Sequence, residues 1–215
     1  MFTIPTLPYY LDVTTAPELP NPDWTPEGWN LGGASGAGPE HPHAGITGWL
    51  TAGDLAVVRA QIPLVYINVV PVRIDATGDV TEIGLLLRIG PQGLSRAIVS
   101  GRVLYHERIR DAIHRHIEND LGPMALPVIP PSPQPFTVAE YLPTPGITPY
   151  YDARQHAVAL AYIVPVTGDC HPRQDAIHID WVAPEEALNP AIQAAFVDGQ
   201  GSLVRQAIAH LGRLP

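Results

Sequence analysis

The sequence predicts an α/β domain that follows a long extended arm, and three observations lead to this prediction. Residues 64–101 contain β-branched, apolar runs separated by glycine-containing turns, which is typical of neighbouring strands. Residues 109–121 repeat apolar side chains every three or four positions, as an amphipathic helix does. Residues 1–46 are rich in proline and glycine, which favours an extended arm. We therefore divide the chain into an arm, residues 1–46, and a single domain, residues 47–215.

The composition limits the kind of protein this can be. With 215 residues, of which 46% are hydrophobic, the chain can form one domain with a sizeable core. The formal charge of −9 argues against nucleic acid or an anionic membrane as a main partner. No apolar run reaches the roughly 20 residues of a membrane span, and the start does not have the features of a signal peptide. A single cysteine, Cys170, excludes an internal disulfide, so we expect a cytoplasmic protein.

The first part of the domain reads as a helix followed by a strand meander. Residues 47–60 predict a helix capped at Thr51, and residues 64–74, 81–90 and 96–101 predict three strands. Four arginines are spaced through the strands, in a chain with only 12 basic residues. A bidentate guanidinium group suits a diphosphate, so we expect Arg96 and Arg102 to contact phosphate. Arg73 and Arg88 are expected to be surface residues that aid solubility.

Residues 109–121 predict an amphipathic helix that Gly122 and Pro123 terminate. Three polar side chains border its apolar side and point into one recess, namely His116, Asn119 and Asp120. Such a cluster predicts either a metal site or a hydrogen-bonded pair of His116 and Asn119 in an inactive site. On the opposite side, Asp111 and Arg115 are expected to form a solvated i,i+4 pair. The apolar side carries Ile109, Ala112, Ile113, Ile117 and Leu121.

The second part of the domain continues with loops, strands and a closing helix. A proline-rich rigid loop is expected at residues 123–135, strands at 136–143 and 156–166, a strand running into a helix at 176–188, and a helix at 202–211. Residues 144–155 predict a long loop, and loops on a rigid scaffold often shape specificity pockets. At its end we expect Tyr151 and His156 to contact a planar group of a ligand, or else to pack against the arm.

The segment 101–122 resembles the Nudix box, the signature of the Nudix hydrolase superfamily. The positions in register are Gly101, Glu107, Arg115, Ile117, Asp120 and Gly122. His116 and Asn119 stand where the family has metal-binding glutamates, and Pro123 replaces the closing aliphatic residue. Trp181, followed by Glu185 and Glu186, is similar to a strand-to-helix junction of the same family. Asp175, six positions before Trp181, matches a further acidic ligand or general base of many members.

This resemblance implies a Nudix-like α/β/α sandwich with a mixed sheet, which hydrolyses a nucleoside-diphosphate-linked or other phosphorylated small molecule with a divalent metal. Carried over residue by residue, Glu107 and Arg115 form an ion pair that orients the box. Metal binding and catalysis would fall to His116, Asp120 and Asp175, with Asn119 as a further metal ligand. Members of the family are often homodimers, and a second subunit would give the arm a docking surface.

The altered ligand set leaves two hypotheses open. One carboxylate, one imidazole and one amide supply less negative charge than three carboxylates, so affinity for Mg²⁺ should fall and Mn²⁺, Zn²⁺ or no metal becomes plausible. In the first hypothesis the protein is a divergent Nudix-type (pyrophospho)hydrolase. In the second it is a catalytically inactive Nudix-fold protein with a ligand-binding or scaffolding role.

Overall fold

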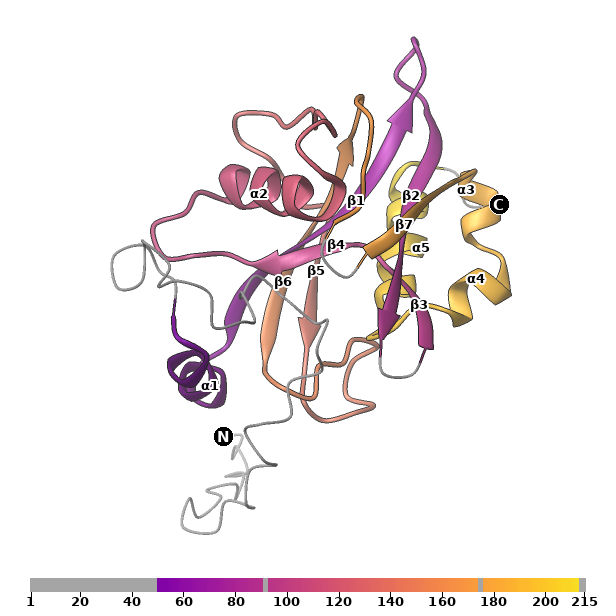
Figure 1. Ribbon diagram of the computed structural model, residues 1–215. Helices are drawn as coiled ribbons and strands as arrows, with labels where there is room; N and C mark the ends of the chain where they lie inside the picture. Colours follow the sequence, from indigo (N-terminus) through magenta and orange to yellow (C-terminus); the bar gives the residue numbers. More distant parts are fainter. Residues whose placement is uncertain (1–49, 91–92, 174–175, 213–215) are drawn as a thin grey trace, which may run out of the picture.

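The computed structural model describes residues 50–90, 93–173 and 176–212, and it has the expected α/β architecture (Figure 1). In the described part, the strands are β1 (Leu64–Ile74), β2 (Val80–Gly90), β3 (Gly93–Ala97), β4 (Val99–Arg102), β5 (Thr137–Tyr141), β6 (Ala157–Pro165) and β7 (Ala176–Val182). The helices are α1 (Ala52–Gln61), α2 (Ile109–Leu121), α3 (Pro184–Ala187), α4 (Pro190–Ala194) and α5 (Gln200–His210). The predicted arm, residues 1–46, lies outside the described residues.

All the strands join one mixed sheet, which has a parallel pair at its centre. β1 and β6 run in the same direction, from Leu64 opposite Ala157 to Val72 opposite Pro165. The remaining pairs, β1 with β2 and β4, β2 with β3 and β7, and β5 with β6, are antiparallel. A parallel pair requires a long crossover connection. Here that connection contains β2, β3, β4, α2 and β5, so the box helix is part of the crossover.

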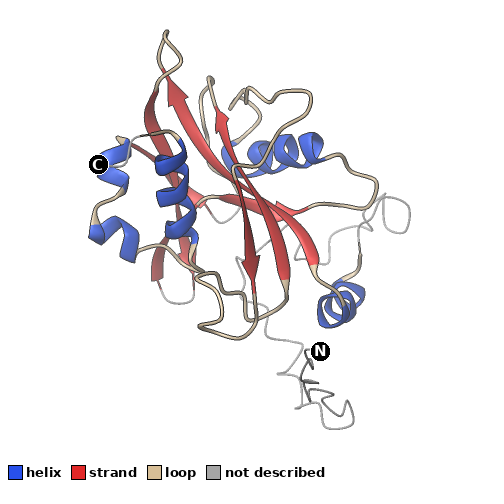
Figure 2. Ribbon diagram, turned by 180° about the vertical axis from the view of Figure 1, so that it is seen from behind, coloured by secondary structure: helices blue, strands red, loops and turns tan. Residues whose placement is uncertain are grey.

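Side chains of β1 alternate between two hydrophobic cores, one on each face of the sheet. Ile67 and Val69 pack with α2, whereas Tyr66 and Val70 pack with α5 and with Leu55 of α1. This alternation follows from the two-residue period of a strand. Figure 1 and Figure 2 show α2 and α5 on opposite sides of the sheet. The fold is therefore an α/β/α sandwich, and we call its two sides the α2 face and the α5 face.

β3 and β4 are two parts of one bent segment that passes from β2 to β1. Ile98 belongs to neither strand, and its N–H donates to the side-chain oxygen Oε1 of Gln200 at 2.9 Å. The first residue of α5 thus supplies the acceptor that the sheet does not offer at the bend. Beyond the bend, Ser100 lines a pocket on the α5 face, whereas Gly101 lies against the ring of His116 on the α2 face.

The two helices that the sequence predicts most specifically are confirmed. The hydroxyl of Thr51 accepts a hydrogen bond from the N–H of Asp54 at 3.1 Å and so caps α1. α2 has the predicted bounds, and Gly122 ends it with a φ of 90°, a conformation that favours glycine. No helix within the described ranges is long and apolar enough to cross a membrane.

Two elements differ from the prediction. The predicted strand 96–101 begins earlier, at Gly93, and is interrupted at Ile98. The predicted strand and helix at 176–188 are followed by the additional helix α4, which the side chain of Asn189 caps by accepting from Ala191 N at 2.9 Å. α4 has five residues, too few for a helical apolar period to be recognised in the sequence.

Candidate active site

An ion pair between Glu107 and Arg115 holds the loop before α2 against the helix. Arg115 Nε and Nη2 donate to Oε1 and Oε2 of Glu107 at 2.6 and 2.7 Å. The same Nη2 donates to the carbonyl of Arg102 at 2.9 Å, and Glu107 Oε2 accepts from Leu104 N. Burial acts to raise the pKa of Glu107, but the hydrogen bonds from Arg115 and Leu104 outweigh it, so this pKa lies below its usual range. The orienting ion pair implied by the resemblance is present.

His116 is held in one orientation in the core of the box. Its ring is 2% exposed, and Nε2 lies 3.0 Å from the carbonyl oxygen of Arg102. A carbonyl can only accept, so Nε2 must carry a proton, and a neutral ring then has its lone pair on Nδ1. The ring packs directly on Gly101. A Cβ added to Gly101 would lie only 1.8 to 2.3 Å from three atoms of the ring. Burial, followed by the charge of Arg115, lowers the pKa of His116 to about 4, so the ring is neutral at pH 7.

Asp120, the carboxylate retained in the box helix, is paired with a cation. Its Oδ2 lies 3.0 Å from Arg88 Nη2, and the two side chains are only 6% and 11% exposed. Arg88 was expected to be a surface residue, and this expectation is wrong. The reason is strand alternation: Arg88 comes two positions after Leu86, which faces the core beneath α2, so its side chain reaches the helix as well.

The described residues do not fit a divalent metal held by carboxylates. The carboxylate of Asp120 is paired with Arg88, and the remaining lone pair of His116, on Nδ1, lies in the buried contact of the ring with Gly101. Asn119 is partly exposed and brings no charge. Within residues 50–90, 93–173 and 176–212, no group of three histidine, cysteine, aspartate or glutamate side chains could hold a metal ion. Asp175, the remaining expected ligand, lies outside the described residues.

Neither arginine expected to contact phosphate lies open on the α2 face. Arg96 of β3 forms an ion pair with Asp180 of β7 at 2.6 Å, and both strands pair with β2. Arg102 stands opposite Tyr66 in the register of β4 and β1, and Tyr66 packs on the α5 face. The side chain of Arg102 is therefore buried on the side of the sheet away from α2, and burial lowers its pKa. Only the carbonyl of Arg102, and not its side chain, faces the box helix, so a phosphate contact of this side chain stays a prediction.

Two further pairings differ from the expectation. Arg73 is not a solvated surface residue, because it donates to the carbonyls of Val166 and Gly168 at 2.5 and 2.7 Å. Its guanidinium also stacks on the ring of Trp181, 4.4 Å from the ring centroid, a favourable cation–π distance. Asp111 pairs with Arg108 at 2.6 Å, and not with Arg115, which is engaged by Glu107.

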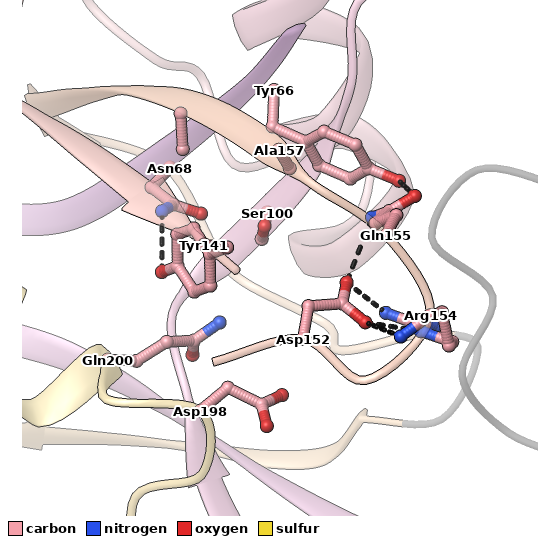
Figure 3. A pocket seen from close by; sticks show the side chains of 11 residues that line it. Tyr66, Asn68, Ser100, Tyr141, Asp152, Arg154, Gln155, Ala157, Asp198 and Gln200 are labelled. Atoms are coloured by element: carbon pink, nitrogen blue, oxygen red, sulfur yellow. Dashed lines mark hydrogen bonds and ion pairs between the residues drawn. The ribbon is translucent and has the colours of Figure 1, made fainter. Parts of the chain in front are cut away.

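The loop at residues 144–155 lies on the α5 face, far from the box helix in the sandwich. His156 forms a hydrogen bond with Glu140 at 3.0 Å, and Tyr151 bridges to Leu142, so both support the loop. Neither of these two residues lines the pocket in Figure 3. Arg154 and Asp152, from the same loop, do line it. The structure thus brings together a group of polar residues that the sequence analysis did not identify.

This pocket, between the sheet and the start of α5, is lined by side chains from distant parts of the chain (Figure 3). Asn68 donates to the hydroxyl of Tyr141 at 2.9 Å, and Gln155 donates to Asp152 at 2.9 Å. Asn68 and Tyr141 are 73 positions apart, and no local spacing could reveal that they meet. One local signal was available, because an Asp-Gly pair at 198–199 directly precedes a helical period and such pairs favour tight turns.

A model of a domain family described as a domain of unknown function (DUF4916) matches residues 45–213, and the chain belongs to this family. A protein from Jonesia denitrificans, described as a possible asymmetric diadenosine tetraphosphate (Ap4A) hydrolase, is 63% identical, with a TM-score of 0.70. That match covers 72% of this chain and 98% of the other. No curated protein matches the chain.

Two more distant structures have the same fold. The Nudix domain of Shewanella oneidensis NrtR, solved with ADP ribose, is 15% identical, with a TM-score of 0.51, and the match covers 70% of this chain and 90% of that one. An Ap4A hydrolase from C. elegans is 17% identical, with a TM-score of 0.50, and the match covers 70% of this chain and 99% of that one. The chain therefore has the Nudix fold, as the resemblance at residues 101–122 predicts.

Proposed function

We propose that this protein binds a phosphorylated, nucleotide-type small molecule on the α2 face without the carboxylate-bound metal of an ordinary Nudix hydrolase. The observation that carries the proposal is the buried ion pair of Arg88 and Asp120, 3.0 Å apart. The ligand class is supported by the fold, since the NrtR domain that shares it was solved with ADP ribose. Slow or absent hydrolysis follows from the same pair.

The charge balance around α2 supports this proposal. Mg²⁺ prefers several oxygen ligands, and it is held by an excess of negative charge. Among the described residues on this face, the two carboxylates Glu107 and Asp120 are each paired with an arginine, and His116 is neutral. Such a site has little attraction for a bare divalent cation. A phosphate, in contrast, could replace the carboxylate of Asp120 at the guanidinium of Arg88, because each presents two anionic oxygen atoms to a bidentate donor.

Hydrolysis of a nucleoside polyphosphate is the second candidate function. The 63% identical protein from Jonesia denitrificans, described as a possible Ap4A hydrolase, favours it. So does the intact pair of Glu107 and Arg115, which keeps the loop and helix of the box in place. This candidate requires Asp120 to separate from Arg88, and it assigns a role to Asp175, outside the described residues.

Calorimetric titration with ADP-ribose and with Ap4A, in chelator and in Mg²⁺ or Mn²⁺, distinguishes the two candidates. We expect binding that chelator does not weaken and no metal-dependent release of product. Arg88→Met should weaken binding by at least about tenfold, the equivalent of roughly 1.4 kcal/mol. Glu118→Gln, at an exposed position of the same helix, is the matched control.

Turnover that needs Mg²⁺ or Mn²⁺ and disappears in Asp120→Asn would establish the second candidate and reject the first. Binding of neither probe in any condition would reject both, because the two candidates share the nucleotide-type ligand.

A further inference from the structure

We propose that the pocket on the α5 face is a second ligand site, which binds a small organic ammonium compound with a short carbon chain. The site lies across the sheet from α2 and is separate from the function proposed above. Three features define it: the shape of the pocket, the carboxylates that face it, and the backbone that places one of them.

The pocket has the walls of a small-molecule site and a small enclosed space. The enclosed space is only about 30 Å³, and the larger volume of about 340 Å³ includes open solvent at the mouth, so the pocket suits a ligand of a few heavy atoms. Carbon surface comes from Ala157 and Ala159 of β6 and from the rings of Tyr66 and Tyr141. Because alanines stand at two successive inward positions of β6, the sheet leaves room that larger residues would fill.

Part of the polar lining is structural and is already satisfied. Arg154 holds Asp152 through Nε and Nη2, at 2.8 and 2.9 Å, and Gln155 donates to the same carboxylate. The oxygen of Gln155 in turn accepts from Arg59 at 2.8 Å and from Tyr66 at 3.3 Å. This network fixes the loop 152–155 as one wall, and it would exist without a ligand.

Asp198 is different, because its carboxylate lines the pocket without such support (Figure 3). Within the described ranges of the chain, no side chain or N–H forms a hydrogen bond or ion pair with this carboxylate. The charges that act on Asp198 are those of Asp152 and Arg154, whereas Arg59 and Arg102 act at the wall formed by Gln155 and Tyr66. Beside Asp198, two carboxylates therefore face one guanidinium, which Asp152 already engages. The surplus negative charge favours a cation and disfavours a phosphate.

The backbone holds Asp198 at the pocket in a conformation that costs free energy. Asp198 has a φ of 56° and Gly199 a φ of 79°, two successive residues in the left-handed region. A Cβ on Gly199 would lie 2.0 Å from the carbonyl oxygen of Pro149, so the turn is also pressed against the loop. Burial, followed by the charge of Asp152, raises the pKa of Asp198 to about 6. A bound ammonium would offset both effects by pairing with the ionised carboxylate.

Hydrogen-bonding groups beside the carboxylates suit the rest of such a ligand. Tyr141 accepts from Asn68 through its hydroxyl oxygen and can still donate its own proton. Gln200 uses Oε1 for the N–H of Ile98, which leaves its amide N–H groups as donors. A ligand with a hydroxyl or carbonyl oxygen a few bonds from the ammonium would therefore meet donors on one side and carboxylates on the other.

The test uses the full-length protein and ethanolamine as the probe, with ethylene glycol as its uncharged counterpart. Binding is followed by two-dimensional NMR, which reports the position of the perturbed residues. We expect ethanolamine to perturb the amides around residues 141, 152 and 198–200, and ethylene glycol at equal concentration to leave them unchanged. Asp198→Asn should weaken ethanolamine binding by about tenfold or more, since the charge pair is lost. Asp169→Asn, at an exposed position outside the pocket, is the matched control and should bind as the unmodified protein does.

A second variant tests the site by shape and leaves its charges unchanged. Ser100→Leu fills the pocket from β4, and it should abolish the ethanolamine response while an ADP-ribose titration on the α2 face stays unchanged. Three results would each overturn the proposal: no response to ethanolamine, an equal response to ethylene glycol, or an equal response in Asp198→Asn. Perturbation of the same amides by Mg²⁺ alone, stronger than by ethanolamine, would also overturn it, because the pocket would then be a metal site.

Discussion

The two faces of β4 carry two contrasting polar sites, although they are separated by a single strand. On the α2 face, the box carboxylates Glu107 and Asp120 are paired with arginines, and the ring of His116 fills the space above Gly101. On the α5 face, Ser100 borders a pocket that is open to solvent, and Asp198 points into it without a partner among the described residues. A shared fold thus locates a site but does not determine its chemistry. Substitutions on the two faces should therefore have different effects.

Gly101→Ala should have the largest effect. Its methyl group would lie 1.8 to 2.3 Å from atoms of the His116 ring, which is enclosed and cannot retreat. We expect the free energy of unfolding to fall by about 4 kcal/mol or more, measured by urea denaturation. The control is Ser100→Ala, the adjacent residue on the open face, which should cost less than about 1 kcal/mol. Equal losses in the two variants would show that the α2 face is not packed as described.

Arg88→Met is expected to be the next largest change, because it leaves the carboxylate of Asp120 buried without its cation. The loss of stability should be about 3 kcal/mol. The double variant Arg88→Met/Asp120→Asn should recover much of it, since no buried charge then remains. Urea denaturation of the two single variants and the double variant measures the coupling. If the double variant were no more stable than Arg88→Met, the pair would not be the source of the cost.

His116 should make stability depend on pH. Its folded-state pKa of about 4 lies below the ordinary value of 6.5, so the buried neutral ring contributes its full stability above pH 6.5. That contribution is lost as the pH falls from 6.5 towards 4, and we expect the loss to be on the order of 2 kcal/mol. In His116→Gln, which keeps a donor for the Arg102 carbonyl, the curve should be flatter over this window. His114→Gln, on the exposed side of α2, should follow the unmodified protein.

Asp198→Asn should have the smallest effect, and the opposite sign. The folded-state pKa of Asp198 is raised to about 6, so its contribution is favourable below pH 3.8 and is lost as the pH rises through 6. Asparagine also tolerates the positive φ at this position. We expect the variant to be more stable at pH 8 by about 1 kcal/mol, after allowing for solvent screening, and to gain nothing at pH 4. Thermal unfolding at the two pH values measures this; a gain at pH 4 would contradict the assignment.

Periodicity in the sequence was sufficient to predict the parts of the fold that local patterns determine. The strand at residues 64–74 and the helix at residues 109–121 have the predicted bounds, since each has a long and uninterrupted apolar pattern. The partners of charged side chains were less predictable. Arg88 and Arg73 were expected to be surface residues that aid solubility, but pairing with α2 and stacking on Trp181 are set by the tertiary packing.

The limits of the sequence are clearest at the two sites. The box pattern correctly located Glu107, Arg115 and His116 around one helix, because they are close in the chain. It could not show that Arg102 turns away, since a bend at Ile98 decides which side chains of β4 face α2. The pocket on the α5 face was missed for a related reason. Its residues come from five separate segments that only the completed sheet brings together.

The contact between His116 and Gly101 also bears on how the chain folds. A strand that pairs one residue out of register turns every side chain to the opposite face. For β4 such a slip would place Ser100 or Arg102 beneath the imidazole, where not even a methyl group fits. His116 would therefore reject misaligned pairing of β4 with β1 at the stage when α2 docks. The buried ring of His116 thus restricts the register in which β4 can pair with β1 once α2 has docked.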